Sequence, residues 1–290
     1  MKKIQILLSM MFCVVLAACE NHLSADDETL HGQLSGNLIL SVFQLEQTPF
    51  STITRSETID LCSRLNFAIY DLSGSRLKQT NQVASDSDFG TAAFQLPEGS
   101  YELIVLAHSS SGNPTMTNPV KIQFSNSLGY SDTFLYDNTI TIGTEPQQID
   151  VNLNRISTLC RFVINDSIPD GVNKLQFKYK GGSGHFNART GLGVTNSIQT
   201  VSFQVQPGTC PSQYDLYTFL HDTAGNLNLQ VTALDASENV LFERTFDVPL
   251  QEKKITWMQG DFFTGQSSSV SQTITITIND QWSGEQHITY

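Results

Sequence analysis

One cysteine near the start of the chain stands where its sulfur could take a lipid. Leu16-Ala17-Ala18-Cys19 follows two lysines and a short apolar run that begins at Ile4. A basic start, an apolar stretch and small residues before a cleavage site are typical of a secretory signal, and a cysteine directly after the cut marks its bacterial lipoprotein form. Two or more acyl chains anchor a protein stably. The sequence therefore predicts a lipoprotein signal peptide over 1–18 and lipidation at Cys19, with an ordinary signal peptide as the alternative.

A glycine-rich motif suggests hydrolase chemistry at first sight. Gly181-Gly182-Ser183-Gly184-His185 resembles the G-x-S-x-G turn that presents a nucleophilic serine, but its fifth residue is histidine and no helical pattern follows. We interpret 181–185 as a mobile glycine loop. The two catalytic carboxylates of a glycoside hydrolase lie far apart in sequence, so the sequence does not exclude such a pair. The sequence as a whole predicts no enzyme and no catalytic residues.

Metal and cofactor sites have little support. Asp86-Ser87-Asp88 has the alternating carboxylates of a calcium loop but lacks the distal glutamate, which favours a solvated turn. None of the six histidines pairs at i, i+2 or i, i+4, and no Cys-x-x-Cys occurs. No phosphate-binding or dinucleotide fingerprint is present. We expect no metal and no cofactor.

Three cysteines remain once Cys13 leaves with the signal and Cys19 is acylated: Cys62, Cys160 and Cys210. Export permits one disulfide, whose connectivity a sequence does not give. Cys160 alternates with Phe162 and Ile164, so we interpret it as a small buried hydrophobe.

The charge balance limits the partners of the protein. The chain has 28 acidic and 16 basic residues, a net charge of −12, and the mature chain loses two lysines with its signal. This acidity argues against nucleic acid and against docking on anionic lipid by charge. Asp26-Asp27-Glu28, inside an expected tether over 19–35, resembles an acidic surface-export signal of outer-membrane lipoproteins; a plain solvated spacer is an equal alternative.

Alternating apolar residues indicate strands almost throughout the chain after Gly36. No stretch of twelve or more residues has a convincing helical period, and turn clusters recur between the strands. The clearest strands are expected at 38–42, 65–69 (half-buried), 92–96, 101–107 (central, covered on both faces), 120–124, 149–153, 159–164, 174–179, 198–205, 227–234 and 240–248. Such spacing predicts an all-β protein of two β-sandwich domains, 36–154 and 155–290. The turn Asp71–Gly74, the turn Pro97–Gly99 and the strand Tyr101–Ala107 look transthyretin-like in pattern.

Several motifs together resemble the fimbrillin-associated anchor and minor-subunit lipoproteins of type V fimbriae. Besides the lipobox they are Arg64-Leu65-Asn66-Phe67-Ala68-Ile69-Tyr70-Asp71, Phe186-Asn187-Ala188-Arg189-Thr190-Gly191, Asp247-Val248-Pro249-Leu250, Gly260-Asp261-Phe262-Phe263-Thr264-Gly265 and Ile276-Thr277-Ile278-Asn279-Asp280-Gln281-Trp282. The resemblance implies two tandem transthyretin-like sandwiches without catalytic activity, a place on the outer membrane and other fimbrial subunits as partners.

In that family, shaft subunits are cleaved after an arginine and lose an N-terminal strand, and a neighbour's strand then fills the groove. Anchor members keep the strand and the lipid. By this resemblance Leu38–Phe43 is the N-terminal strand, and Arg55 is the one candidate processing site; a plain loop arginine is the favoured alternative.

A strictly alternating segment near the C-terminus is a candidate donor strand. It consists of Thr273, Ile274, Thr275, Ile276, Thr277 and Ile278, after the flexible joint Gln266–Ser269. Its apolar face could complete a neighbour's sheet or close its own domain. The competing function is a surface glycan-binding lipoprotein of a polysaccharide-uptake system, which exposed tryptophans in a cleft would favour. Trp257 and Trp282, both near predicted strand ends of the second domain, are expected to pack in the core or at a strand end instead.

Overall fold

The structure, a computed structural model, describes residues 36–45, 62–264 and 285–289. The predictions for the signal peptide over 1–18, Cys19, the tether over 19–35, Arg55, Trp282 and the segment Thr273–Ile278 therefore lie outside the described residues.

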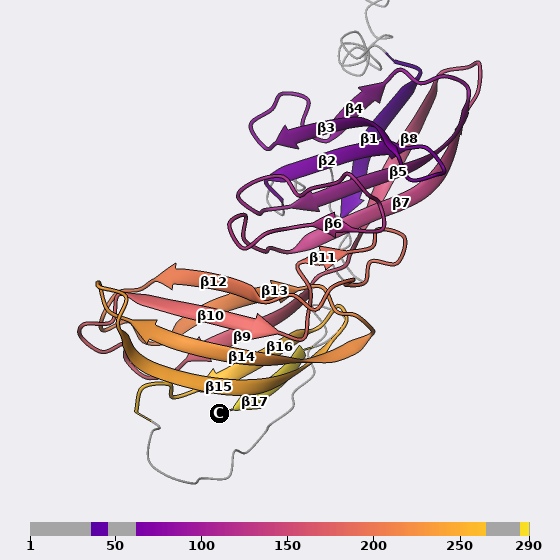
Figure 1. The fold of residues 1–290 in the computed structure, drawn as a ribbon. Coiled ribbons are helices and arrows are strands. Elements are labelled where there is room, and N and C mark those ends of the chain that lie inside the picture. Colours follow the sequence, from indigo (N-terminus) through magenta and orange to yellow (C-terminus); the bar gives the residue numbers. More distant parts are fainter. Residues whose placement is uncertain (1–35, 46–61, 265–284, 290) are drawn as a thin grey trace, which may run out of the picture.

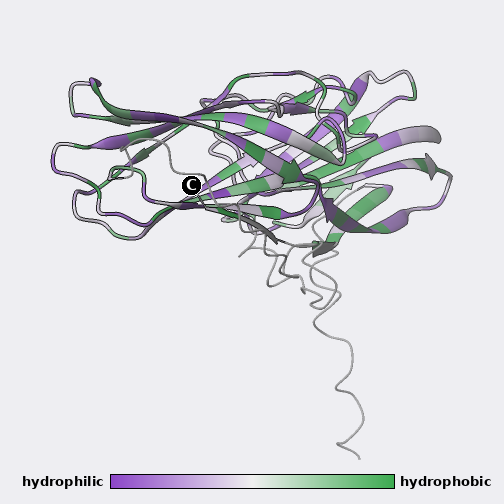
Figure 2. Ribbon diagram, turned by 90° about the horizontal axis from the view of Figure 1, so that it is seen from below, coloured by the Kyte–Doolittle hydropathy of each residue, from purple (hydrophilic) through white to green (hydrophobic). Residues whose placement is uncertain are grey.

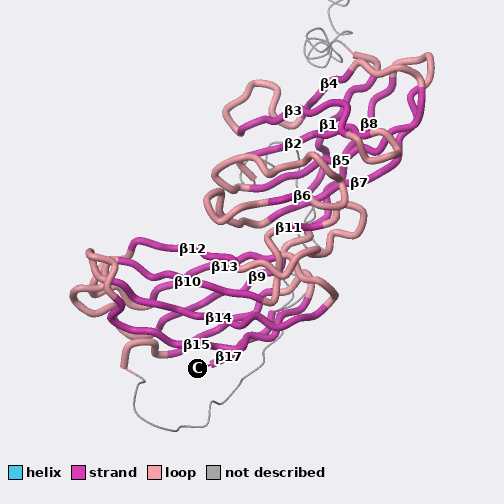
Figure 3. Tube along the Cα trace, in the orientation of Figure 1, coloured by secondary structure: helices cyan, strands magenta, loops and turns pink. Residues whose placement is uncertain are grey.

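All regular elements in the described ranges are strands, which confirms the all-β prediction (Figure 3). Along many of them hydrophobic and hydrophilic residues alternate, as Figure 2 shows. This period of two places one set of side chains in a core and the other outside it.

The first domain is a sandwich of two layers (Figure 1). Its strands are β1 (Leu38–Leu45), β2 (Arg64–Tyr70), β3 (Arg76–Val83), β4 (Thr91–Phe94), β5 (Gly99–His108), β7 (Thr133–Ile142) and β8 (Gln147–Arg155). The hydrogen-bonded order is β3-β2-β5-β7-β8-β1-β4. Because β7 and β8 pair only at Phe134 with Arg155 and at Leu135 with Asn154, they join two layers rather than one flat sheet.

Strand β5 is the central strand of the first layer, as predicted. It lies between β2 and β7. Leu103, Val105 and Ala107 face the core of the sandwich, whereas Ile104 and Leu106 belong to a second apolar cluster on the opposite face. Strand β2 was predicted to be half-buried, but it is buried on both faces, because the second cluster also covers Ala68 and Tyr70.

The second domain is a sandwich of two four-stranded sheets. Its strands are β9 (Thr158–Ile164), β10 (Lys174–Lys180), β12 (Gln199–Gln204), β13 (Ser212–Thr218), β14 (Ala224–Leu234), β15 (Val240–Gln251), β16 (Ile255–Gly260) and β17 (Glu285–Thr289). The orders are β12-β10-β14-β15 and β13-β9-β16-β17. A cluster rich in phenylalanine, with Phe162 and Phe177 fully buried, fills the space between the sheets. The chain passes between the domains after Arg155, where β8 ends, and before Thr158, where β9 begins.

Six strands have no counterpart in the expected set: β3, β7, β13, β16, β17 and the two-residue strand β11 (His185–Phe186). Strand β3 is mostly exposed and polar, so it carries no period-two signal. The expected strand at 120–124 shrinks to β6 (Ile122–Gln123), which pairs with β11 of the second domain. This short pair joins two loops rather than extending a sandwich sheet.

Candidate subunit interface

The N-terminal strand β1 is a full member of the first sandwich. It lies between two neighbours, antiparallel to β4 and parallel to β8. Its first residue, Leu38, stands opposite Phe94 on β4 and Gln147 on β8. Such a strand contributes main-chain hydrogen bonds on both sides, and its removal would leave a groove between β4 and β8.

Four side chains of β1 fill that groove. Leu38, Leu40, Val42 and Leu45 are each at most 1% exposed. The spacing of two, two and three residues follows a register shift against β8 between Val42 and Gln44. At about 1.5–3 kcal/mol for each fully buried side chain, these four contribute on the order of 6–12 kcal/mol of apolar burial. The first sandwich therefore depends on β1 or on a strand of the same pattern.

The entry into β1 is also fixed. The side chain of Asn37 accepts a hydrogen bond from the amide of Leu96 at 2.9 Å and donates one to the Leu96 carbonyl at 2.7 Å. Gly36 lies so close to β4 that a Cβ atom there would stand 2.6 Å from the carbonyl oxygen of Phe94. A pulling force on the chain before Gly36 would act on these contacts of Gly36 and Asn37 and on β1.

Two loops join the sandwiches to each other (Figure 1). Beside the β6–β11 pair, the amide of Phe124 donates to the carbonyl of Gly184 at 2.9 Å and the amide of Ala188 donates to the carbonyl of Pro119 at 2.9 Å. Phe124 also packs on Phe186 and Phe219 of the second domain, at ring-centroid distances of 6.5 and 6.0 Å. Main-chain bonds and a shared apolar cluster thus connect the domains.

An ion pair closes the same joint. The guanidinium of Arg189 donates to both carboxylate oxygens of Glu102 on β5, at 2.8 and 2.7 Å. The side chain of Glu102 is 7% exposed and that of Arg189 46% exposed. Burial, together with the charge of Glu102, raises the pKa of nearby Asp137 on β7 to about 6, against the opposing effect of Arg189.

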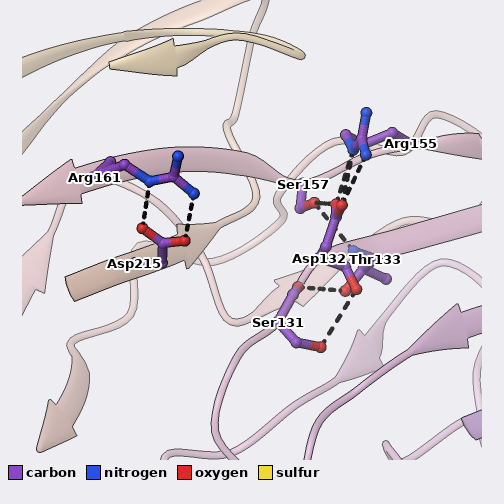
Figure 4. Close-up of polar contacts among 7 residues, drawn as sticks. All are labelled: Ser131, Asp132, Thr133, Arg155, Ser157, Arg161 and Asp215. Atoms are coloured by element: carbon purple, nitrogen blue, oxygen red, sulfur yellow. Dashed lines mark hydrogen bonds and ion pairs between the residues drawn. The ribbon is translucent and has the colours of Figure 1, made fainter. Parts of the chain in front are cut away.

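A second carboxylate holds the short connection between the domains (Figure 4). Asp132 accepts bonds at 2.8–3.0 Å from the guanidinium of Arg155 and one at 2.7 Å from the hydroxyl of Ser157. The amide of Thr133 donates to Ser157 Oγ at 3.1 Å, and Ile156 donates its amide to the carbonyl of Thr133 at 2.9 Å. Arg155 at the end of β8 and both residues before β9, Ile156 and Ser157, are therefore bonded to Asp132 or Thr133 of the first domain.

The prediction of a mobile loop at 181–185 was wrong. Ser183 is fully buried, and its hydroxyl donates to the carbonyl of His185 at 2.6 Å. A Cβ atom at Gly182 would stand 2.0 Å from Oγ1 of Thr218, and one at Gly184 would stand 2.8 Å from the ring of Tyr130. The glycines allow close packing at the joint, so this serine is a structural residue.

The other polar motifs are also structural in the described residues. Asp86 caps its turn, because its carboxylate accepts the amide of Val83 at 2.8 Å. No group of histidine, cysteine and carboxylate residues in the described ranges could hold a metal ion. Cys62 and Cys160 are buried, as expected for Cys160, and Cys210 is exposed.

Trp257 offers little to a sugar ring. It lies within β16 rather than at a strand end, and Arg161 from β9 stands over its ring at 4.9 Å from the centroid. Arg161 in turn donates to both carboxylate oxygens of Asp215 on β13, at 2.7 Å each (Figure 4). The hollow at the domain joint beside Tyr217 and Phe219 leaves no room even for a water molecule, whereas ligand pockets typically begin at ~300 Å³.

Sequence reasoning missed the residues that form the joint. Arg189 lies in one of the quoted motifs, but nothing in the sequence links it to Glu102, 87 positions earlier. The signal available was a single glutamate in an apolar strand, Tyr101–Ala107, because a carboxylate placed inside such a strand needs a partner.

A family model described as "Family of unknown function (DUF6562)" matches residues 33–290. No curated protein matches the chain. The part of the chain that the structure describes holds no helix long and apolar enough to cross a membrane.

Solved structures similar to the chain include fimbrial and adhesin proteins. One, assigned as an adhesin from Bacteroides ovatus, has 15% identity and a TM-score of 0.48, with 78% of this chain and 87% of that chain covered. The fimbrial anchor protein Mfa2 from Porphyromonas gingivalis has 13% identity and a TM-score of 0.39, covering 71% and 80%. A fimbrial assembly protein from Parabacteroides distasonis has 11% identity and a TM-score of 0.34, covering 77% and 89%.

Proposed function

The chain belongs to the DUF6562 family, and we propose that this member is an anchor or accessory subunit of a cell-surface fimbria. In this proposal a lipid on Cys19 holds the protein at the outer membrane, and the two sandwiches join other subunits by β-strand addition. The protein catalyses no reaction and needs no cofactor.

The observation that carries the proposal is the place of β1. The lipid cysteine precedes Leu38 by 19 residues, so a subunit tethered at Cys19 is pulled through β1. Because β1 pairs with β8 from Leu38 to Leu45 and with β4 from Leu38 to Ser41, tension along the strand loads many hydrogen bonds together. A strand built into the sheet in this way suits a subunit that stays fixed to a membrane.

The same strand suggests how growth of a polymer ends. If the chain stays intact at Arg55, β1 keeps its own groove filled and no neighbour's strand enters it. This subunit would then join the polymer by donating a strand, for which the alternating segment Thr273–Ile278 is the candidate. Cleavage after Arg55 would convert the same fold into an acceptor.

The experiment follows fimbriae and the protein together in its native cells. Cys19→Ala should release the protein from the outer membrane, and fimbriae that depend on it should appear in the medium. Mass spectrometry of the mature N-terminus checks acylation, and electron microscopy counts cell-bound fimbriae. Arg55→Ala is the matched variant: an anchor tolerates it, whereas a processed subunit would lose assembly. Fimbriae that stay cell-bound in a strain lacking the whole gene would contradict the proposal.

A further inference from the structure

Strand β12 is an edge strand with none of the usual protection against pairing. It pairs with β10 alone among the described strands, and residues 198–204 hold no charge and no proline. The other described edges of the sandwich sheets are protected: β3 carries Arg76 and Lys78, β4 has four residues, β15 holds Pro249, β13 carries Asp215, and β17 carries Glu285. Natural sheets use these devices to prevent edge-to-edge association.

The first domain already pairs with the beginning of this edge. The side-chain amide of Asn126 donates to the carbonyl of Ile198 at 3.4 Å and accepts the amide of Thr200 at 2.9 Å. In a parallel ladder the amide and the carbonyl of one residue make the same two bonds, to the residues on either side of its partner. The side chain of Asn126 therefore makes the two hydrogen bonds that one residue of an added strand would make.

This contact also shows which main-chain groups point outward. Successive residues of a strand direct their amide and carbonyl groups to alternate sides. Since the amide of Thr200 is bonded to Asn126, the amides of Ser202 and Gln204 and the carbonyls of Thr200 and Ser202 point the same way, away from β10. Two donors and two acceptors in alternation suit one further strand.

The core is incomplete beside the same edge. Among the hydrophobic residues that pack against the second core, Val201, Phe203 and Phe242 are the partly buried ones, and the first two belong to β12. Phe203 contacts Phe177 and Tyr214 at ring-centroid distances of 5.7 and 5.1 Å. A strand added to β12 with apolar residues at alternate positions would extend this core.

We propose that the β12 edge accepts the Thr273–Ile278 segment of a second copy of this chain. That segment is uncharged, has six residues like β12, and alternates isoleucine with threonine. Its isoleucines would continue the apolar row of Val201 and Phe203, and its threonines would lie on the solvent side with Ser202. This inference rests on the proposed function, because it names an acceptor for strand addition.

Such a contact joins different surfaces of two copies. A head-to-tail contact of this kind generates an open filament unless its rotation closes a ring. The edge thus offers the chain a way to associate with itself that leaves the groove of β1 untouched.

The test uses the whole chain after Cys19 and a labelled peptide of residues 270–281. Ser202→Pro removes an outward amide and places a ring where the incoming strand must lie, yet it spares the bonds to β10. Ser202→Thr is the matched control. We expect the peptide to bind the parent and the control, and the proline variant to bind at least tenfold more weakly, with sedimentation equilibrium showing a parallel loss of self-association.

Several outcomes would contradict the assignment of β12 as the acceptor. Equal peptide binding by Ser202→Pro and Ser202→Thr overturns the inference. If the proline variant unfolds, Ser202→Lys and Gln204→Lys place charges at the edge without altering the backbone, and the same tenfold loss is expected. If hydrogen exchange shows the Ser202 amide protected in dilute monomer, the chain's own segment occupies the edge and the second-copy assignment falls. Fimbriae that still contain the Ser202→Pro protein would leave the proposed function standing while this inference fails.

Discussion

Arg189 of the second domain and Glu102 of the first form an ion pair with two hydrogen bonds, at 2.8 and 2.7 Å. The pair lies beside the β6–β11 strands and on the outer face of the layer that holds β2, β5 and β7. It therefore links the central strand of one sandwich to a loop of the other. Because Glu102 is almost inaccessible, its carboxylate depends on this partner more than a surface charge would.

Arg189→Ala should weaken the coupling between the domains. The loss leaves a buried carboxylate unpaired, which costs about 3–5 kcal/mol in a fully buried pair; with Arg189 46% exposed, we expect roughly 1–3 kcal/mol in the free energy of unfolding. Glu102→Gln in the same chain should recover part of the loss, because the charge is then gone. Urea unfolding of the two single variants and the double variant measures the coupling.

Lys174→Ala provides the control for a charge pair on the surface. Lys174 contacts Glu238, whose side chain is 64% exposed, so its removal should change the free energy of unfolding by no more than about 1 kcal/mol. An equal effect of Lys174→Ala and Arg189→Ala would show that the Glu102 pair contributes no more than an ordinary surface contact.

Asp137 should make the protein less stable as the pH rises through about 6. Burial, then Glu102, raises its pKa in the folded state to about 6, with Arg189 opposing, whereas an unfolded aspartate titrates near ~3.9. The folded state therefore binds the proton more tightly, and the stability that this proton supplies is present at acidic pH and lost as the pH rises through about 6. Asp137→Asn should flatten the difference in unfolding free energy between pH 5 and pH 7.5. An unchanged pH dependence in this variant would exclude Asp137 as its source.

Local patterning made the fold predictable wherever a strand buries one face. Strands β8 and β10 have clean alternation in the sequence and in the structure. Strand β3 was not predicted, because its first three residues are all exposed and its pairing with β2 is made by the backbone. Strand β2 was misjudged as half-buried, since the loop that covers its second face through Met116 and Phe124 comes about fifty residues later.

The joint between the domains was beyond sequence reasoning for a related reason. The pairs Glu102–Arg189 and Asn126–Thr200 span 87 and 74 positions. The glutamate in an apolar strand predicts a partner but not which residue supplies it, and Asn126 stands in a polar segment where it gives no signal. The sequence shows three glycines in 181–184, but it does not distinguish a glycine required for close packing from one in a mobile loop. Only the neighbours, such as Thr218 against Gly182, distinguish the two.

Leu40→Ala in β1 should destabilise the first sandwich by about 2–5 kcal/mol, the range for removing a large aliphatic side chain from a core. Leu40 is fully buried in the cluster that also holds Leu65 and Phe67. Leu72→Ala is the control, because Leu72 is 62% exposed and lies in a turn, and it should change stability by less than about 0.5 kcal/mol. Thermal unfolding of both variants measures the difference. A Leu40→Ala protein as stable as the parent would mean that β1 contributes little to the sheet, and the tether would then lack a firm attachment.

Gly182→Ala should disrupt the domain joint through a single methyl group. The added Cβ would stand 2.0 Å from Oγ1 and 2.9 Å from Cγ2 of Thr218, so either the loop or β13 must shift. Thr218 is 1% exposed and also bonds to the side chain of Gln199, which leaves it little freedom to move, and overpacking of this kind costs about 1–3 kcal/mol. Adding Thr218→Ala removes both clashing atoms, so the double variant should be more stable than Gly182→Ala alone. Gly143→Ala, with no atom within 4 Å of its Cβ position, is the matched control and should behave as the parent. Differential scanning calorimetry of the four proteins separates a steric effect, which Thr218→Ala relieves, from a backbone effect at Gly182, which it would leave unchanged.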